Sequence, residues 1–241
     1  MSVYAVADFH GIYGLYEQIK EFIKPEDTVI FLGDAADRGP DGWRLIQDLM
    51  ADPQFIYLKG NHEEMLADAM EEYLDSDGRE TFAIQHLVSN GGEPTIISWM
   101  IDGAPRNMIK KLRELPFFYT YENQEGKIIV LSHSGTPPIK NRHTGDYHMI
   151  ERLALWDRDH CWVPNWGEED LDMILVHGHT PIPYFFEGEN VDIEIEPGAF
   201  WYCEDHKVNL DNGSCASGYT CLFDLDTYDE HIFFEDIFTD K

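Results

Sequence analysis

Five short apolar segments of this chain each lead into a residue that can bind a metal ion or carry a proton. The segments have the length and composition of buried strands. They are residues 3–7 before Asp8 and His10, residues 29–32 before Gly33 and Asp34, residues 55–58 before Asn61 and His62, residues 128–131 before His133, and residues 173–176 before His177, Gly178 and His179. A chain with this pattern must fold so that many polar groups lie at strand ends.

Segments of helical periodicity lie between the first three apolar runs. Apolar residues recur at helical spacing across residues 12–23 and again across residues 43–50. The order strand, helix, strand, helix, strand predicts an α/β fold in which helices pack against a sheet. The carboxyl ends of such strands share one edge, where open α/β folds bind ligands. We therefore expect the polar residues that follow the strands to converge at one site.

The rest of the chain is predicted to add a helical insertion and more strands. Residues 63 to about 115 are mostly helical in pattern, with breaks at residues 75–78 and 90–92. A strand is expected at residues 116–121. Four short β-type runs are expected to form a second sheet layer, at residues 184–186, 191–195, 219–225 and 231–234. No linker or change in composition divides the chain, so residues 1–241 are expected to form a single domain.

Charge and cysteine content exclude several classes of protein. The chain has 17 basic and 46 acidic residues, a formal net charge of −29, and 43% hydrophobic residues that can supply a core. Nucleic acids and anionic membranes require clustered Lys and Arg, so neither is an expected partner. Without an apolar run of about 20 residues or a basic leader, a cytoplasmic location is expected. The cysteines show no CxxC spacing, which excludes zinc-finger and thioredoxin motifs and predicts reduced thiols at Cys161, Cys203, Cys215 and Cys221.

The polar residues at the strand ends form a set of oxygen and imidazole ligands. The candidates are Asp8, His10, Asp34, Asn61, His133 and His179. Such ligands suit manganese, iron, zinc or nickel better than ions that prefer thiolates. One carboxylate can bridge two ions, and two ions roughly 3.5 to 4 Å apart can hold a phosphoryl group and ionise a bridging water. The set therefore indicates a dinuclear site for phosphate chemistry.

At these residues the sequence resembles the calcineurin-like metallophosphoesterases, and within them the bacterial and phage branch of the Ser/Thr phosphoprotein phosphatases. That family carries the motifs GDxHG, GDxxDRG, GNHE, HxG and GHT in this order. The matching segments are Ala7-Asp8-Phe9-His10-Gly11, Gly33-Asp34-Ala35-Ala36-Asp37-Arg38-Gly39, Gly60-Asn61-His62-Glu63, His133-Ser134-Gly135 and Gly178-His179-Thr180. The likeness extends from Val3 to about Pro181. Further on, Leu210-Asp211-Asn212-Gly213 resembles the DTG strand of the family except at Asn212.

The resemblance implies a calcineurin-like α/β/β/α sandwich, with two mixed sheets flanked by helices and two divalent metal ions. Manganese is favoured, with iron, zinc or nickel as alternatives. By motif position, the first ion is expected on Asp8, His10 and Asp34, and the second on Asp34, Asn61, His133 and His179. Also by motif position, His62, oriented by Asp37, is expected to protonate the leaving oxygen, while Arg38, Arg158 and Asn61 contact the phosphoryl group. Arginine presents a planar donor fork that matches phosphate, and a carboxylate beside an imidazole raises the pKa of the imidazole.

Departures from the motifs narrow the expected substrate. Nuclease and cyclic-phosphodiesterase branches usually end in GHxH, but Pro181 stands at the second histidine, which disfavours phosphodiesters. Glu63 and Asp37 favour phosphoprotein phosphatases over symmetrical diadenosine tetraphosphate hydrolases, which typically read GNHD and lack the aspartate of DRG. We therefore expect a metal-dependent phosphomonoesterase acting on phosphoserine or phosphothreonine in proteins, and on small phosphate esters. A nucleotide pyrophosphate hydrolase is the first alternative, and a non-catalytic scaffold is the second.

The remaining histidines and tryptophans are expected to be structural. His177 lies two residues before His179 and is interpreted as a buried core histidine rather than a group that supports the ligands. Core packing is favoured over an aromatic wall beside Arg158 for Trp156, Trp162 and Trp166. Surface positions are expected for the histidines that share no spacing, which are His86, His143, His148, His160, His206 and His231.

Overall fold

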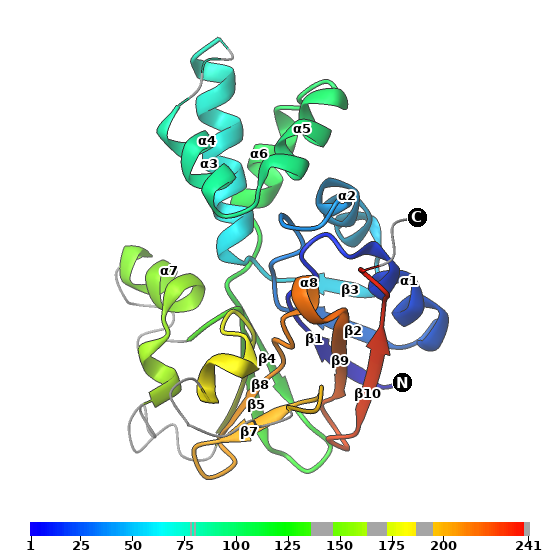
Figure 1. Ribbon diagram of the computed structural model, residues 1–241. Helices are drawn as coiled ribbons and strands as arrows, with labels where there is room; N and C mark the ends of the chain where they lie inside the picture. Colours follow the sequence, from blue (N-terminus) through cyan, green and yellow to red (C-terminus); the bar gives the residue numbers. More distant parts are fainter. Residues whose placement is uncertain (78, 80, 136–146, 163–172, 187–194, 239–241) are drawn as a thin grey trace.

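Two five-stranded sheets packed face to face form the body of the protein (Figure 1). The computed structural model describes residues 1–77, 79, 81–135, 147–162, 173–186 and 195–238. Apolar side chains from both sheets meet in one buried cluster between them. With helices packed outside, this arrangement confirms the predicted α/β sandwich of two mixed sheets.

The first sheet has the strand order β10-β9-β1-β2-β3. Its three parallel strands are β1 (Val3–Val6), β2 (Thr28–Phe31) and β3 (Phe55–Tyr57), linked by helices α1 (Tyr13–Phe22) and α2 (Gly42–Ala51). Strand β9 (Tyr219–Asp224) pairs antiparallel with β1, and β10 (Glu230–Phe234) pairs antiparallel with β9. The strand and helix alternation predicted for the N-terminal part is therefore confirmed.

The second sheet has the strand order β4-β5-β6-β8-β7. Strands β5 (Ile128–Ser132), β6 (Met173–His177) and β8 (Lys207–Asn209) are parallel to one another. The antiparallel strands β4 (Phe118–Glu122) and β7 (Phe200–Tyr202) close the two edges. Helix α7 (Tyr147–Trp156) and the 3₁₀ helices η2 (Asp159–Trp162) and η4 (Ile182–Phe186) lie beside this sheet, whereas the short α8 (Ser214–Ser217) precedes β9 (Figure 1).

Alternation along the strands divides the apolar residues between two cores. In β1, Val3 and Ala5 face the second sheet, whereas Tyr4 and Val6 face the helices. The helices supply matching apolar stripes from residues at helical spacing, which are Leu15, Ile19, Leu45, Ile46 and Leu49. Both faces of the first sheet are therefore covered, and the ends of its strands are held rigidly where the polar residues begin.

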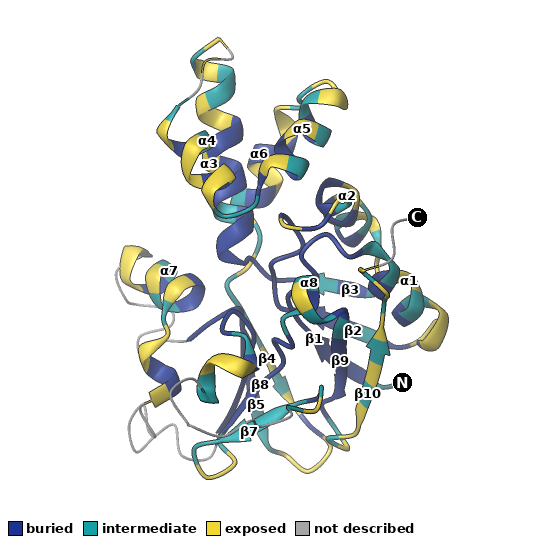
Figure 2. Ribbon diagram, in the orientation of Figure 1, coloured by how far each residue is buried: buried dark blue, intermediate teal, exposed yellow. Residues whose placement is uncertain are grey.

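The helical insertion follows β3 and projects beyond the sheets (Figure 1). It consists of α3 (Asn61–Asp75), α4 (Phe82–Ser89), α5 (Glu93–Ile101) and α6 (Asn107–Arg113). The breaks before α4 and α5 fall where the sequence predicted them, whereas the break between α5 and α6 was not predicted. The residues that face inward between these helices are buried and the outer ones are exposed (Figure 2). Of the helices in the described part, none has the length and apolar character needed to cross a membrane.

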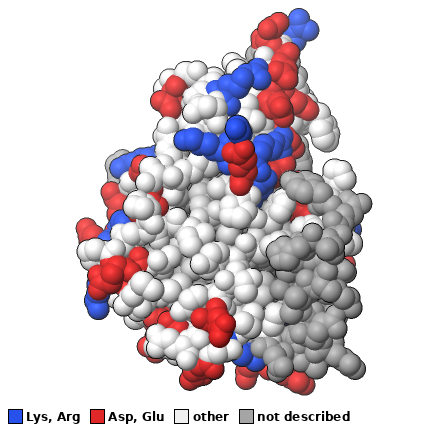
Figure 3. All heavy atoms as spheres, turned by 180° about the vertical axis from the view of Figure 1, so that it is seen from behind, with Lys and Arg blue, Asp and Glu red and all other residues white. Residues whose placement is uncertain are grey.

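Charged side chains of both signs gather over the insertion on the face seen from behind, whereas the middle of that face is mostly uncharged (Figure 3). Arg113 of α6 forms ion pairs with three acidic residues of α3, which are Glu64, Asp68 and Glu71. Lys59, buried just before α3, adds a 3.0 Å contact to Glu64. These ion pairs tie the last helix of the insertion to its first.

Two predictions for the C-terminal part are wrong. The run at residues 184–186 is not a strand but part of the 3₁₀ helix η4, in which the Tyr184 N–H donates to the Pro181 carbonyl. Pro181 and Pro183 have no N–H to give to a sheet, which favours this local turn. The runs at residues 219–225 and 231–234 are strands, but they extend the first sheet instead of forming a second layer. Of the run at 191–195, residues 191–194 lie outside the described residues.

Candidate metal centre

Six predicted ligands come together where the ends of both sheets meet. Asp8 and His10 follow β1, Asp34 follows β2, and Asn61 is the first residue of α3 after β3. From the second sheet, His133 follows β5, whereas His179 follows β6. All six side chains are buried. The predicted convergence therefore draws on both sheets, although the pattern of the sequence indicated only a shared strand edge.

Left-handed backbone conformations direct these ligands inward. The φ angles of Asp8, His10, Asp34 and His179 are 56°, 45°, 59° and 66°. Such angles are uncommon outside glycine and are found where surrounding contacts enforce a sharp turn. Close packing of the turns also requires glycine at Gly178, where an added Cβ would lie 2.0 Å from Asp8 Oδ2.

One group of ligand atoms surrounds the space between His10 and Asp34. His10 Nδ1 lies 2.9 Å from the Ala36 carbonyl oxygen, so it carries the proton and leaves a lone pair on Nε2. That Nε2 atom is 3.6 Å from Asp34 Oδ2 and 4.0 Å from Asp8 Oδ1. Because one imidazole lone pair and two carboxylates face each other here, the donors fit a divalent cation.

A second group of ligand atoms lies on the other side of Asp34. His133 Nδ1 donates to the Leu32 carbonyl over 3.0 Å, so its Nε2 also carries a free lone pair. This Nε2 lies 2.8 Å from Asn61 Oδ1, 3.1 Å from His179 Nδ1 and 3.4 Å from Asp34 Oδ1. So many buried oxygen and nitrogen ligand atoms at such short range suit a cation between them. The residues therefore fit a pair of metal ions with Asp34 between the two groups.

The protonation states suit ligands for cations. Burial is the largest influence on Asp34 and opposes its ionisation, but the surrounding histidines outweigh it and lower the pKa of this carboxyl. Burial lowers the pKa of His10 to about 3. Burial and then the neighbouring charges of Asp211 and Asp34 raise the pKa of Asp8. Asp34 is thus ionised and His10 neutral at ordinary pH, whereas Asp8 lies in a negative environment that a bound cation would stabilise.

His62, Asp37 and Arg38 lie beside the first ligand group. Asp37 Oδ2 accepts a hydrogen bond from His62 Nδ1 over 2.7 Å, and the Asp37 N–H is held by Thr95 Oγ1 at 2.9 Å. Arg38 reaches between two imidazoles, with Nη1 2.7 Å from His10 Nε2 and Nη2 3.1 Å from His62 Nε2. Burial lowers the pKa of His62, but Asp34 and Asp37 outweigh burial and raise it overall.

Arg158 also lies at the site, where its Nη2 donates to the His179 carbonyl over 3.4 Å. The expected core packing of the tryptophans is wrong for Trp156 and Trp162, which are 41% and 61% exposed. The Trp156 ring lies edge-on to His179 with 6.4 Å between centroids, so an aromatic surface does border the ligands. Trp166 lies outside the described residues.

His177 is buried, as predicted, but it points away from the ligands towards Tyr202 and His160. The surface prediction is wrong for His160, which is only 4% exposed. His86 and His148 are exposed as expected, His206 and His231 are partly buried, and His143 lies outside the described residues. Asn212 holds a loop by hydrogen bonds to both Gly198 and the Leu210 carbonyl.

Two further carboxylates at the site were not among the sequence candidates. Glu63 accepts hydrogen bonds from the N–H groups of Asp34 and Gly60 at 2.8 Å and of Ala35 at 2.9 Å, so it joins two ligand loops. The sequence feature that could have identified Glu63 is its place as the third residue of a helix, where a glutamate side chain can cap the start of that helix. Asp211 follows β8 in the same way that the ligands follow their strands, and burial raises its pKa to about 7.

A two-sheet α/β sandwich with oxygen and imidazole ligands from both sheets fits the class of metal-dependent hydrolases, which includes the phosphoesterases. Comparison with known proteins identifies the family within that class. A model of the calcineurin-like phosphoesterase family matches residues 1–210. The chain therefore belongs to the calcineurin-like phosphoesterases, a family of hydrolases that depend on dinuclear metal centres.

Curated relatives include two kinds of phosphatase. The chain is 38% identical over 226 residues to serine/threonine-protein phosphatase 2 of Escherichia coli, covering 90% of this chain and 89% of that protein. It is 24% identical over 142 residues to the symmetrical bis(5'-nucleosyl)-tetraphosphatase of Delftia acidovorans, covering 57% of this chain but only 46% of the relative. Among solved structures, the cold-active protein-tyrosine phosphatase of a Shewanella species has the same fold, with a TM-score of 0.61, 15% identity, and coverage of 97% of this chain and 77% of the other.

Proposed function

We propose that this chain hydrolyses phosphomonoesters, with phosphoserine and phosphothreonine residues of proteins as its principal substrates. The observation that carries the proposal is the 2.7 Å contact between Asp37 and His62, with Arg38 beside the same imidazole. Serine and threonine phosphates release a poor alkoxide leaving group, which benefits from a proton donor held in place. The similarity to serine/threonine-protein phosphatase 2 over most of both chains supports the same substrate class.

In this proposal, Asp8, His10 and Asp34 bind one divalent ion, and Asp34, Asn61, His133 and His179 bind the other. Asp34 is suited to be the shared ligand because its Oδ2 faces His10 and its Oδ1 faces His133. When bound, the ions would neutralise the charge of the phosphoryl group and acidify the attacking water. The protein itself supplies the orientation of the ester and the proton for the leaving group.

Arg38 is placed to link substrate binding to proton transfer. Its Nη1 donates to His10 Nε2, which is a proposed ligand atom, so metal binding would free Nη1 for a phosphoryl oxygen. Its Nη2 donates to His62 Nε2, so a turn of the guanidinium towards phosphate would also leave that nitrogen free to carry a proton. His62 could then protonate the leaving oxygen while Asp37 holds the ring. Arg158, beside His179, is the second candidate for contact with the phosphate.

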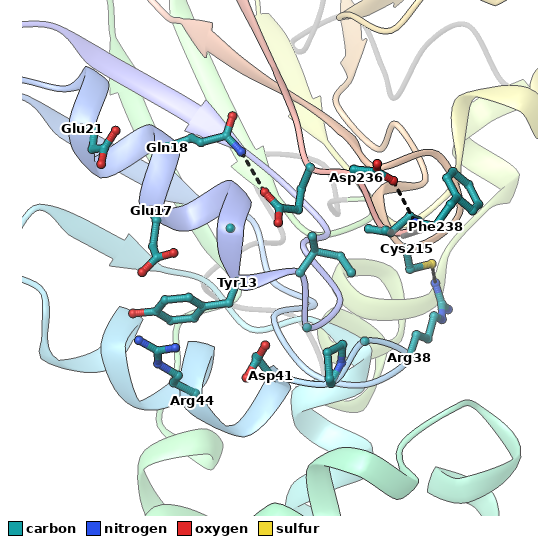
Figure 4. A pocket seen from close by; sticks show the side chains of 17 residues that line it. Tyr13, Glu17, Gln18, Glu21, Arg38, Asp41, Arg44, Cys215, Asp236 and Phe238 are labelled. Atoms are coloured by element: carbon teal, nitrogen blue, oxygen red, sulfur yellow. Dashed lines mark hydrogen bonds between the residues drawn. The ribbon is translucent and has the colours of Figure 1, made fainter. Parts of the chain in front are cut away.

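A groove next to Arg38 offers room for the peptide on one side of the phosphorylated residue. Its volume is about 810 Å³, and Arg38 and Cys215 lie at one end of it (Figure 4). Its lining carries five carboxylates, which are Glu17, Glu21, Asp41, Glu235 and Asp236, and a second guanidinium, Arg44, whose charge lies 3.5 Å above the Tyr13 ring. The excess of negative charge favours substrates with Lys or Arg flanking the phosphorylated residue.

A nucleotide pyrophosphate hydrolase remains the second candidate because of Trp156. Its exposed ring borders His179 and could stack on a nucleobase. Symmetrical bis(5'-nucleosyl)-tetraphosphatases are also among the relatives of this chain. Glu63 and Asp37, by contrast, follow the phosphoprotein phosphatase pattern. The non-catalytic scaffold is disfavoured because the complete ligand set is retained and buried.

We further propose manganese as the native metal, since the candidate ligands of the dinuclear centre are oxygen and imidazole atoms. The four free cysteines suit a reducing compartment, which supports a cytoplasmic location. The buried core between the two sheets, which draws residues from both, supports our proposal of a single catalytic domain over residues 1–241.

The test compares kcat/KM for a phosphoserine peptide and for diadenosine tetraphosphate, both with Mn²⁺ in excess. We expect clear preference for the phosphopeptide. Asp34→Asn, purified in the same way, should lose activity on both substrates and so excludes a contaminating phosphatase. Preference for diadenosine tetraphosphate, together with a selective loss of that activity in Trp156→Ala, would replace the proposal with the second candidate.

A further inference from the structure

We propose that this protein contains a separate buried site for a soft divalent ion of the zinc type, formed by His160, Cys161 and His177. The three side chains each offer one ligand atom, and these atoms all lie within 4.8 Å of one another. His160 and Cys161 belong to η2, whereas His177 is the last residue of β6. All three are buried, and none is part of the dinuclear ligand set.

The spacing of the two donor atoms from η2 suits a tetrahedral ion. Cys161 Sγ lies 3.7 Å from His160 Nε2. A tetrahedral zinc ion with bonds of about 2.3 Å to sulfur and 2.0 to 2.1 Å to nitrogen separates those two ligands by about 3.6 Å. The thiol and the imidazole therefore already stand close to the distance that such an ion requires.

The second nitrogen of each imidazole is directed as in a metal-binding histidine. Ligating histidines usually direct their other N–H to a carbonyl or a carboxylate. His177 Nδ1 donates to the Gly178 carbonyl over 2.9 Å, which leaves the lone pair on Nε2. His160 Nδ1 lies 3.6 Å from Asp157 Oδ2 and, among the described residues, has no hydrogen-bond partner in the strict sense. Both rings can thus donate outward while their remaining nitrogens face the cluster.

Tyr202 and Lys207 complete the surroundings of the cluster. The Tyr202 hydroxyl lies 2.6 Å from His177 Nε2, so an entering ion would replace this hydrogen bond and find an oxygen beside it for a fourth ligand. Lys207 donates to the His160 carbonyl oxygen. Burial raises the pKa of the Cys161 thiol, and the charge of Lys207 opposes this only in part, so a bound cation would be needed to hold the thiolate. A thiolate with two imidazoles selects a softer ion than the oxygen-rich dinuclear set does.

An ion at this place would brace the turn that carries a catalytic ligand. His177 is followed by Gly178, which packs directly against Asp8, and then by His179. An ion bound by both His177 and η2 would fix the turn at residues 177–179 on the side that faces away from the dinuclear centre. The role inferred is therefore structural, and the experiment needs a readout that the dinuclear centre cannot give.

Cobalt provides that readout, because a thiolate ligand adds an intense sulfur-to-cobalt charge-transfer absorption and the proposed dinuclear set contains no sulfur. We expect the metal-stripped protein to bind three equivalents of Co²⁺ and to develop this absorption. Cys161→Ser should lose the absorption and one equivalent. Cys215→Ser, which removes a thiol elsewhere in the fold, should keep both.

His160→Gln provides a second test that keeps the Cys161 thiol. It should also lose one equivalent of Co²⁺ and the absorption, with an unchanged circular dichroism spectrum. If the wild-type protein binds only two equivalents and shows no charge-transfer absorption, or if the absorption persists in both His160→Gln and Cys161→Ser, the cluster is not a metal site.

Discussion

Replacing Gly178 with alanine should disable the metal centre through one steric contact. Gly178 does not have a left-handed φ, so alanine can adopt its backbone conformation without strain. The added Cβ would lie 2.0 Å from Asp8 Oδ2 and 2.8 Å from the Cβ of Ala7. The effect of the substitution therefore falls mainly on the carboxylate that is proposed to bind the first metal.

The size of the effect follows from that distance. Asp8 Oδ2 must retreat by about 1.4 Å to reach an ordinary contact distance of 3.4 Å. Metal sites tolerate only about 0.2 Å of error in ligand distance, and a displacement of about 1 Å near the chemistry can reduce the rate 10²-fold. We therefore expect kcat/KM to fall by at least about 10², equivalent to about 2.7 kcal/mol of transition-state stabilisation.

The assay combines metal content by mass spectrometry, hydrolysis of p-nitrophenyl phosphate and the melting temperature. Gly198→Ala is the matched control, because its Cβ would lie 2.5 Å from Glu230 Oε2, an exposed carboxylate that can move aside. The control should retain both metals and wild-type turnover. Two tightly bound metals and unchanged kcat/KM in Gly178→Ala would refute the placement of Asp8 as a ligand.

Three further predictions concern the proton donor, the shared ligand and the groove. His62→Ala should slow hydrolysis of an alkyl phosphate by about 10² to 10⁴ but affect p-nitrophenyl phosphate much less, because that leaving group needs no proton; equal losses with both metals bound would contradict the assigned role. Asp34→Asn should bind fewer than two metals per chain and lose most activity, and an unaffected variant would exclude Asp34 as the shared ligand. Peptides with Lys or Arg beside the phosphoserine should have higher kcat/KM than acidic peptides. This difference should shrink as the salt concentration rises from about 0.01 to about 0.15 M, and also in the double variant Glu17→Gln, Glu21→Gln. No dependence of kcat/KM on peptide charge would contradict the groove assignment.

The sequence predicted the fold and the ligand cluster because the determining signals are local. An apolar run followed by Asp8 or Asp34 specifies both a strand and the polar residue at its end, so both can be found without tertiary information. Parallel strands joined by helices then bring these ends together. The contact of Asp37 with His62, which the family resemblance implied, lies where it was expected.

What the sequence could not predict depends on pairing between distant segments. The alternation in β9 and β10 marks them as strands, but it does not say which sheet they join. The burial of His160 results from packing between η2 and β6, which no local spacing encodes. Glu63 looked like part of a motif, yet its role in joining two loops appears only when Asp34 and Gly60 are seen to share it.

The residues with left-handed backbone conformations around the metal centre lower the stability of the folded protein. Of the twelve non-glycine residues with positive φ in the described part of the chain, six are proposed site residues, which are Asp8, His10, Asp34, Asp37, Arg38 and His179. Glycine would adopt each of these conformations with less strain, a difference on the order of 1 kcal/mol per position. A search for thermostable variants that scored folding alone would therefore favour glycine at these positions and remove the catalytic groups. Evolution of this fold towards higher stability must proceed elsewhere in the chain, because the conformations that weaken it are the ones that aim its ligands.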